Sequence, residues 1–247
     1  MDALGARSVQ TVAIGIFCKT PAPGLSKTRL SPPLRPDECA AISACFIRDL
    51  AGTIAEVARD GASVGYAVYT PVGTENALRT LLPTGFRLLP QCEGDFGVRL
   101  MTATRQLLQT HAGAIMVNAD SPTLPAAILS AAVSATRRGN AVVLSPALDG
   151  GYTLVGVSKT HPRLYEDIPW STAAVFQRTV ERAAEIDLLV VTVPGWYDVD
   201  DAASLAILES EFAGEPPFAD AFPGAEAPAT RAHLMARKAP LRAGSAR

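Results

Sequence analysis

The 247-residue chain has little of what marks zinc-binding, membrane-spanning or nucleic-acid-binding proteins. Its four cysteines form no Cys-x-x-Cys pair and its three histidines are dispersed, which argues against a zinc site and indicates reduced thiols. Its 22 Lys and Arg residues face 24 Asp and Glu residues, so no overall basic field exists for a nucleic-acid polymer. No apolar run reaches the roughly 18 residues that cross a bilayer, and the start lacks an apolar signal core. We therefore expect a cytoplasmic protein without a membrane or nucleic-acid partner.

Strand-like apolar runs alternate with helical patterns along most of the chain. The strand-like runs lie at residues 11–18, 63–69, 86–90, 114–119, 140–146, 152–158 and 188–194. The helical patterns lie at residues 36–58, 73–82, 97–110, 125–138, 172–185 and 201–212. This alternation predicts an α/β fold, a three-layer sandwich around a mostly parallel sheet. Runs 140–146 and 152–158 are joined by only a short Asp-Gly-Gly connection, so this pair is predicted to be antiparallel.

Composition divides the chain into three parts. Residues 1–10 are predicted to be a flexible N-terminus and residues 11–212 a single domain. From residue 213 the sequence turns to Ala, Pro and Gly with scattered charge, which predicts a disordered tail over residues 213–247. Within that tail, residues 231–238 have room for one or two helical turns.

A basic loop follows the first strand-like run. It reads Lys19-Thr-Pro-Ala-Pro-Gly-Leu-Ser-Lys-Thr-Arg29 and combines three cations, Lys19, Lys27 and Arg29, with Gly24. Open α/β sheets bind ligands at the carboxyl ends of their strands, and convergent cations there suit a phosphate chain. Pro21 and Ser26 stand where a Walker-type P-loop has glycines, and no Gly-x-Gly-x-x-Gly follows, so neither motif is predicted. The alternative interpretation is a solvated surface loop.

A carboxylate follows the central run 114–119. Asp120 opens the sequence Asp120-Ser-Pro-Thr-Leu-Pro125 and is predicted to emerge at the carboxyl edge of the sheet, held in a rigid turn by the two prolines. The alternative is an Asx turn that caps the next helix.

A second acidic cluster, Asp198-Val-Asp-Asp201, follows the last strand-like run. In an extended segment Asp198 and Asp200 share one side, with Val199 packing inward. Two unit charges about 4 Å apart repel by roughly 4 kcal/mol at an effective dielectric of about 20, and a shared cation would relieve this. Asp198 and Asp200 are therefore predicted to help hold Mg²⁺ or Mn²⁺ in an all-oxygen site. Asp201 is predicted to be a helix cap.

Two glycine-rich turns complete the candidate site. The turn containing Asp149, Gly150, Gly151 and Tyr152 is read as a hairpin, as a floor on which a ligand lies close to the backbone, or as both. The turn containing Gly94, Asp95 and Arg99 precedes a helix whose amides suit a phosphate or a substrate hydroxyl; alternatively, Arg99 is a surface helix residue. Asp95 or Asp149 is a candidate base, since no histidine is placed for that role.

Taken in order, these motifs and Ile168-Pro-Trp170-Ser-Thr172 resemble a known family over residues 11–212. The chain resembles the GT-A-fold arsenosugar-biosynthesis glycosyltransferases, the radical-SAM and selenodomain-associated transferases. It is also similar to 2-phospholactate guanylyltransferases and nucleotide-diphospho-sugar transferases. The resemblance implies a GT-A (Rossmann-like) fold, a nucleotide beside the basic loop, and a metal near Asp120. The chain departs from the family pattern at Phe96 and Asp201, where Leu and Thr are expected.

The leading hypothesis is glycosyl transfer from a metal-bound nucleotide sugar to a small acceptor. The residues assigned to substrate are Gly150, Gly151, Tyr152 and Trp170, and those assigned to nucleotide are Lys19, Gly24, Lys27, Arg29, Gly94 and Arg99. One alternative is nucleotidylyl transfer, in which a phosphorylated acceptor attacks a nucleoside triphosphate and pyrophosphate leaves. Another is a non-catalytic nucleotide-binding module. The oligomeric state stays open, a homodimer included.

Overall fold

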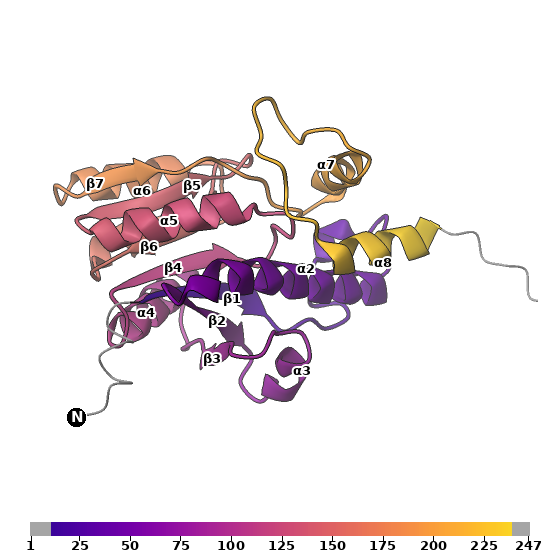
Figure 1. Ribbon diagram of the computed structural model, residues 1–247, viewed down its shortest axis with the longest axis horizontal. Coiled ribbons are helices and arrows are strands. Elements are labelled where there is room, and N and C mark those ends of the chain that lie inside the picture. Colours follow the sequence, from indigo (N-terminus) through magenta and orange to yellow (C-terminus); the bar gives the residue numbers. More distant parts are fainter. Residues whose placement is uncertain (1–10, 239–247) are drawn as a thin grey trace, which may run out of the picture.

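A seven-stranded sheet runs through the middle of the protein (Figure 1). The computed structural model describes residues 11–238, so the predictions for residues 1–10 and 239–247 lie outside the described residues. The strands are β1 (Val12–Lys19), β2 (Ser63–Thr70), β3 (Arg87–Pro90), β4 (Gly113–Asn118), β5 (Ala141–Pro146), β6 (Tyr152–Val157) and β7 (Leu189–Thr192). Their order across the sheet is β3-β2-β1-β4-β6-β5-β7.

Strand directions agree with the sequence prediction. β6 is antiparallel to both of its neighbours, β4 and β5, and every other pair in the described sheet is parallel. The two-glycine turn after Asp149 is too short to carry the chain back for a parallel pairing, so β5 and β6 form a hairpin. The mostly parallel sheet with a small antiparallel part is confirmed.

Helices cover both faces of this sheet. One face packs against α2 (Pro36–Val57) and α5 (Ala126–Arg138), and the other against α4 (Phe96–Leu108) and α6 (Val175–Ala184). Helix α7 (Ala202–Phe212) lies to one side of the sheet, and its Leu205 and Leu208 join the same core cluster as α2 and α5. The remaining elements are the short helix α3 (Glu75–Arg79), the 3-10 turns η1 (Thr28–Leu30), η2 (Ala58–Asp60) and η3 (Pro162–Tyr165), and α8 (Pro228–Lys238). Figure 1 shows α2 and α5 in front of the sheet. The predicted three-layer sandwich is therefore confirmed.

Helix α2 illustrates why the layers form where they do. Its apolar positions Ile42, Phe46, Leu50 and Ile54 recur every four residues, and all four side chains are fully buried against the sheet. Pro36 opens the helix, and the Glu38 carboxylate accepts a hydrogen bond from the Arg35 N–H at 2.8 Å. No helix within residues 11–238 is both long and apolar enough to span a membrane.

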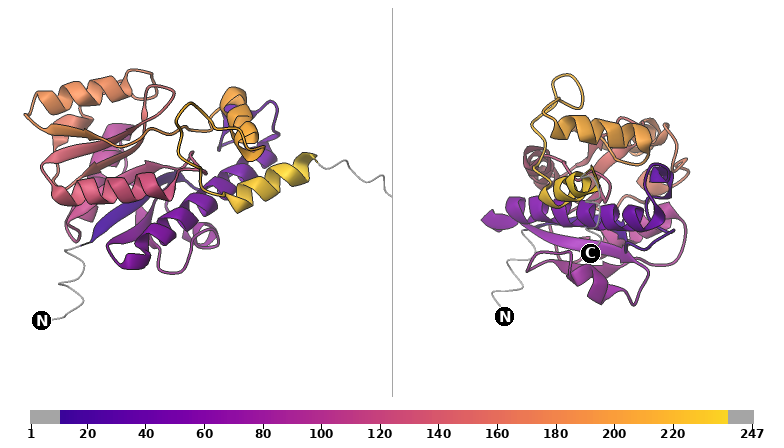
Figure 2. Two further views of the ribbon diagram at one scale, coloured as in Figure 1. Left: turned by 45° about the horizontal axis from the view of Figure 1, so that its top comes forward. Right: turned by 90° about the vertical axis from the view of Figure 1, so that its right-hand side faces the viewer.

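The C-terminal part of the chain differs from the predicted disordered tail. Helix α8 lies alongside α2 in both views (Figures 1 and 2), with Leu234 buried against the core. Asp49 of α2 caps the start of α8, because the two carboxylate oxygens of Asp49 accept hydrogen bonds from the N–H groups of Ala229 and Thr230 at 2.9 and 2.7 Å. The prediction of disorder is therefore wrong for residues 228–238, where a buried acid from a distant helix supplies the cap.

The arrangement of the strands decides where a ligand site lies. Phe17 near the end of β1 pairs with Asn118 at the end of β4, and Tyr152 at the start of β6 pairs with Pro146 at the end of β5. The loops that follow β1, β4, β5 and β7 therefore meet at one edge of the sheet.

Candidate functional site

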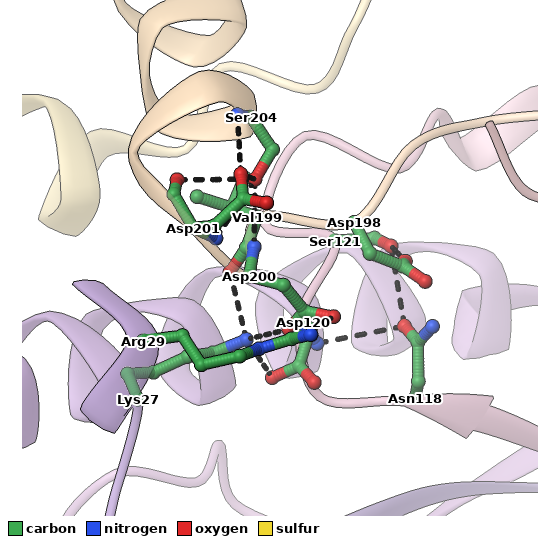
Figure 3. A network of polar contacts seen from close by, with 10 residues as sticks. All are labelled: Lys27, Arg29, Asn118, Asp120, Ser121, Asp198, Val199, Asp200, Asp201 and Ser204. Carbon is green, nitrogen blue, oxygen red and sulfur yellow. Dashed lines mark hydrogen bonds and ion pairs between the residues drawn. The ribbon is translucent and has the colours of Figure 1, made fainter. Parts of the chain in front are cut away.

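Lys27 lies at the centre of a polar network formed by these loops (Figure 3). Its Nζ atom is 2.6 Å from Oδ1 of Asp120 and 2.8 Å from Oδ1 of Asp200, and it donates a hydrogen bond to the carbonyl of Val199 at 2.8 Å. An ammonium group has three hydrogens, so these three acceptors satisfy it completely. The side chain is only 7% exposed. The central prediction of the sequence, that the basic loop and Asp120 meet, is confirmed.

The backbone at Lys27 is held in an uncommon conformation. Its φ of 49° and ψ of 40° lie in the left-handed region, which costs a residue with a side chain on the order of 1 kcal/mol. The preceding turn is closed by hydrogen bonds between Ala22 and Ser26, the Ala22 N–H donating to Ser26 Oγ and the Ser26 N–H to the Ala22 carbonyl. The turn and the ion pairs together offset this cost and fix the direction of the Lys27 side chain.

Electrostatics keep Lys27 charged. Burial alone would lower the pKa of its ammonium group, but the carboxylates of Asp120 and Asp200 outweigh burial, so the pKa lies above its ordinary value. Arg29 adds a second cation, with Nη2 2.7 Å from Oδ2 of Asp200. The Arg29 side chain is 69% exposed, so this outer pair is open to solvent and to a ligand.

The two acidic turns are joined directly. The Val199 N–H donates a hydrogen bond to the carbonyl of Asp120 at 2.9 Å, and Ser121 Oγ donates to Oδ1 of Asp198 at 2.5 Å. Val199 itself is fully buried, as predicted. Burial, with the charge of Asp120 adding to it, raises the pKa of the Asp198 carboxyl to about 7.

Asp198 and Asp200 make different contacts, although the sequence predicts that both point at one site. Asp200 pairs with Lys27 and Arg29, whereas Asp198 turns away toward Ser121 (Figure 3). The chain enters α7 directly after Asp200, whose N–H donates to Ser204 Oγ at 2.8 Å, so the segment no longer alternates like a strand. Asp201 caps α7 through the Ser204 N–H at 2.9 Å, as predicted.

Two neighbouring pockets open onto this network. The first, of about 280 Å³, is called the basic pocket and is lined by Phe17, Cys18, Lys19, Ser26, Lys27, Thr28, Arg29, Ser43, Ala119, Asp120 and Asp200. The second, of about 240 Å³, is called the aromatic pocket, and its polar and aromatic lining is Phe17, Phe96, Asn118, Asp120, Asp149, Tyr152, Thr153, Trp170, Ser171, Thr172 and Asp198. Phe17 and Asp120 line both. A ligand that passes Asp120 can therefore occupy both pockets.

Three rings form one wall of the aromatic pocket. The ring centroids of Phe17 and Phe96 are 5.3 Å apart, and those of Phe96 and Trp170 are 4.8 Å apart. Gly97 permits this approach, because a Cβ atom there would lie 2.7 Å from the Tyr165 carbonyl and 3.0 Å from Trp170 Nε1. Sequence reasoning missed Phe17, which reads as a core strand residue, and met Phe96 only as a departure from a family pattern.

Some predicted site residues lie elsewhere within residues 11–238. Gly24, Gly94, Asp95, Arg99 and Gly150 line neither the basic nor the aromatic pocket. The Asp95 carboxylate caps α4 by accepting the Val98 N–H at 2.8 Å, and the Arg99 guanidinium donates to Gln91 Oε1 at 2.8 Å.

The Asp149 turn supports both interpretations given to it. Gly150 has a φ of 88°, and a Cβ atom there would lie 2.3 Å from the Ala173 carbonyl, so the hairpin requires glycine at this position. Gly151, Tyr152, Trp170 and Asp149 line the aromatic pocket, as a ligand floor would. Their role in substrate binding stays a prediction.

The described residues include no group of three or more His, Cys, Asp or Glu side chains arranged to hold a metal ion. Asp120 and Asp198 nevertheless line the same pocket, and the charge of Asp120 helps to raise the pKa of Asp198. Two carboxylates at one pocket suit a hard cation that takes its other ligands from water and substrate phosphates. Of the three aspartates predicted to hold a metal, Asp120 and Asp198 therefore stay candidate ligands, and Asp200 does not.

Comparison with known proteins gives the fold its context. Residues 53–172 match the family described as "Uncharacterized protein conserved in bacteria (DUF2064)". A "putative nucleotide-diphospho-sugar transferase" from Desulfovibrio desulfuricans is 25% identical, with a TM-score of 0.77 over 92% of this chain and 94% of that one. The search of curated proteins found no match.

A synthetase and a synthase share the fold at lower identity. CMP:2-keto-3-deoxy-manno-octonic acid synthetase complexed with CTP is 12% identical, with a TM-score of 0.54 over 83% of this chain and 99% of that one. The 4-diphosphocytidyl-2C-methyl-D-erythritol synthase from Anaerococcus prevotii is 10% identical, with a TM-score of 0.53 over 86% and 100%. The predicted GT-A-type α/β fold is confirmed by these structures together with the sheet order.

Proposed function

We propose that this chain is a metal-dependent transferase that acts on a nucleotide-activated substrate and transfers a glycosyl group from a nucleotide sugar to a small acceptor. The observation that carries the proposal is the position of Asp120, between a pocket with three cations and a pocket with an aromatic wall. A nucleotide sugar has a diphosphate for the first pocket, and its transferable ring would lie beside Asp120, where the two pockets meet. The similarity to a protein described as a nucleotide-diphospho-sugar transferase supports this assignment.

Arg29 would bind the diphosphate directly. It lies in the basic pocket with Lys27 and is a charged donor that can form short hydrogen bonds to phosphate oxygens. The three hydrogens of Lys27 are taken by Asp120, Asp200 and Val199, so Lys27 would contribute its positive charge and hold the two carboxylates in place. Arg29 is largely exposed, so it can turn from Asp200 to a ligand with little loss. Lys19 is exposed at the same pocket and would contribute mainly long-range attraction.

Asp120 and Asp198 would hold the Mg²⁺ or Mn²⁺ ion. Magnesium is usually bound by one or two carboxylates together with substrate phosphates, which agrees with a pair of carboxylates on the protein. When bound, such an ion neutralises the negative charge that develops on a departing nucleoside diphosphate. Asp200 stays with Lys27 in this proposal.

Asp149 is the proposed base. It is exposed at the aromatic pocket, and its Oδ1 accepts the Gly151 N–H at 2.9 Å, which fixes the carboxylate. In the proposed step the acceptor oxygen forms a bond to the anomeric carbon as the bond from that carbon to the diphosphate breaks. The acceptor proton passes to Asp149 and the nucleoside diphosphate leaves. Asp95 is omitted because its carboxylate caps α4.

Nucleotidylyl transfer is the second candidate. Three cations in one pocket suit a triphosphate as well as a diphosphate. In that reaction a phosphorylated acceptor would attack the α-phosphate and release pyrophosphate. A link to arsenosugar biosynthesis, which the sequence resemblance implies, stays a prediction.

The test is a thermal-shift screen of nucleotide sugars and nucleoside triphosphates, each with and without Mn²⁺, followed by product analysis of every ligand that binds. A ligand of the native state raises the melting temperature by mass action. We expect a nucleotide sugar to raise it in wild type and in Arg105→Ala, an exposed cation of α4 outside both pockets, but not in Asp120→Asn. Pyrophosphate release from a triphosphate would instead establish the second candidate. No binding of either class to folded protein would contradict both.

A further inference from the structure

We infer that the aromatic pocket takes the acceptor, and that this acceptor is an uncharged molecule with hydroxyl groups and an apolar face, not a phosphorylated one. The inference rests on the proposed function, because it places the donor phosphates in the basic pocket. An uncharged acceptor of this class favours glycosyl transfer over nucleotidylyl transfer, which needs a phosphorylated acceptor.

The charge of the aromatic pocket is the first argument. Within residues 11–238, three aspartates line it, Asp120, Asp149 and Asp198, and no Lys, Arg or His does. Asp120 is neutralised by Lys27, but Asp149 and Asp198 take part in none of the ion pairs formed within residues 11–238. The metal ion proposed at Asp120 and Asp198 is assigned to the donor phosphates, so an anionic group elsewhere in this pocket would face Asp149 without a compensating cation.

The cations at this edge of the sheet are divided unequally between the two pockets. Three cations at this edge of the sheet, Lys19, Lys27 and Arg29, line the basic pocket and are assigned to the donor. A fourth, Arg99, does not line the aromatic pocket: its guanidinium packs against the rings of Phe17 and Phe96 and donates a hydrogen bond to Gln91. A phosphorylated acceptor would need further cations, as charge-assisted pairing of phosphate requires. A hydroxyl group, in contrast, donates a hydrogen bond that a carboxylate such as Asp149 accepts well.

The ring wall is the third argument. Phe96 is 38% exposed, and its ring packs against Trp170 at the pocket. Aromatic faces of this kind bind apolar surface at low conformational cost, such as the C–H face of a sugar or polyol ring. Hydroxyl-accepting carboxylates and an apolar wall together suit one class of molecule, an uncharged polyhydroxylated acceptor.

Trp170 allows the charge of the pocket to be measured without any enzyme assay. The chain has two tryptophans, and the other one, Trp196, is only 1% exposed. Subtracting the emission of a Trp170→Phe variant leaves the signal of Trp170 alone. The quenching of Trp170 fluorescence by caesium, iodide and neutral acrylamide is then measured at low salt with a metal chelator present. Each quenching constant is divided by the constant for a free tryptophan amide.

We expect caesium to quench Trp170 more effectively than iodide, by a scaled ratio on the order of threefold, because the carboxylates attract the cation and repel the anion. Asp149→Asn should reduce that ratio, whereas Asp60→Asn, an exposed acid of η2 outside the pocket, should leave it unchanged. Equal quenching by the two ions, or a ratio that Asp149→Asn does not alter, would overturn the inference.

A second arm identifies the occupant with three probes: glucose, glucose 6-phosphate and uridine. Glucose should shield Trp170 from acrylamide at a concentration at least tenfold below that needed for glucose 6-phosphate. Shielding by the phosphate ester at an equal or lower concentration would overturn the inference, and shielding by uridine would assign the pocket to a nucleobase instead. Failure of the proposed function is a separate result, because it appears as loss of nucleotide binding in the thermal-shift screen.

Discussion

Replacing Lys27 by methionine tests the network on which the site is built. Lys27→Met keeps an unbranched side chain and removes the ammonium group, which lies 5.6 Å from the centre of the Phe46 ring and donates to the Val199 carbonyl. Asp120 then loses its cation, and Asp200 keeps only its ion pair with Arg29. The left-handed backbone is unchanged, so the difference in stability reports the ion pairs.

The structure sets the size of this effect. Removing one partner of a fully buried ion pair costs about 3–5 kcal/mol, but the carboxylates of Asp120 and Asp200 are 35% and 31% exposed, so water takes over part of the role of Lys27. We therefore expect a loss of about 2 kcal/mol in the free energy of unfolding. For a protein of this size that corresponds to a fall in melting temperature of about 4–8 °C.

The assay is thermal unfolding in metal-free buffer, with Arg29→Met as the matched control. Arg29 carries the same charge in the same loop but is 69% exposed, so its replacement should cost less than about 1 kcal/mol. The double variant Lys27→Met with Asp200→Asn should recover part of the loss, because a carboxylate left without its cation is removed. A Lys27→Met variant as stable as Arg29→Met, or a double variant whose losses simply add, would refute the reasoning.

Three further predictions concern single carboxylates. The pKa of Asp198 is raised to about 7, so the native state holds a proton that the unfolded chain releases, and wild type should lose stability as pH rises from about 4 to 7. Asp198→Asn should lack this loss. In urea unfolding with a metal chelator, the free energy of unfolding of Asp198→Asn should therefore gain about 2 kcal/mol relative to wild type between pH 5 and pH 8. Asp49→Ala removes the cap of α8 and should cost about 1–2 kcal/mol, with faster hydrogen exchange in α8 but not in α5; equal exchange in α8 would contradict the docking. Asp201→Ala removes the cap of α7 and should lower the free energy of unfolding by about 1 kcal/mol, and an unchanged urea midpoint would count against it.

Most of the fold follows from local patterns in the sequence. The alternation of apolar runs with helical stripes predicts the layers, and the short Asp-Gly-Gly connection predicts the antiparallel hairpin of β5 and β6. The meeting of Lys27 and Asp120 also follows, because the loops after two parallel neighbouring strands emerge at the same edge. These features depend on the direction of the strands and on the spacing of apolar residues, both of which can be inferred from the sequence.

Other features depend on contacts that no local pattern records. The start of α8 is capped by Asp49, which lies about 180 residues earlier in the chain. The composition of the C-terminal segment alone indicates disorder. Asp198 and Asp200 diverge because α7 begins immediately after them. Phe17 becomes part of a pocket wall only because Gly97 lets Trp170 approach Phe96.

The most direct test of the central claim is a calorimetric titration of nucleotide into wild type, Arg29→Ala and Arg105→Ala in the presence of Mg²⁺, using the ligand that the thermal-shift screen selects. The claim is that the basic pocket beside Asp120 binds the phosphates of a nucleotide. We expect Arg29→Ala to bind at least about tenfold more weakly than wild type, since a charge-assisted hydrogen bond is worth about 1.5–3 kcal/mol, while Arg105→Ala binds like wild type. Equal affinities for Arg29→Ala and Arg105→Ala would contradict it.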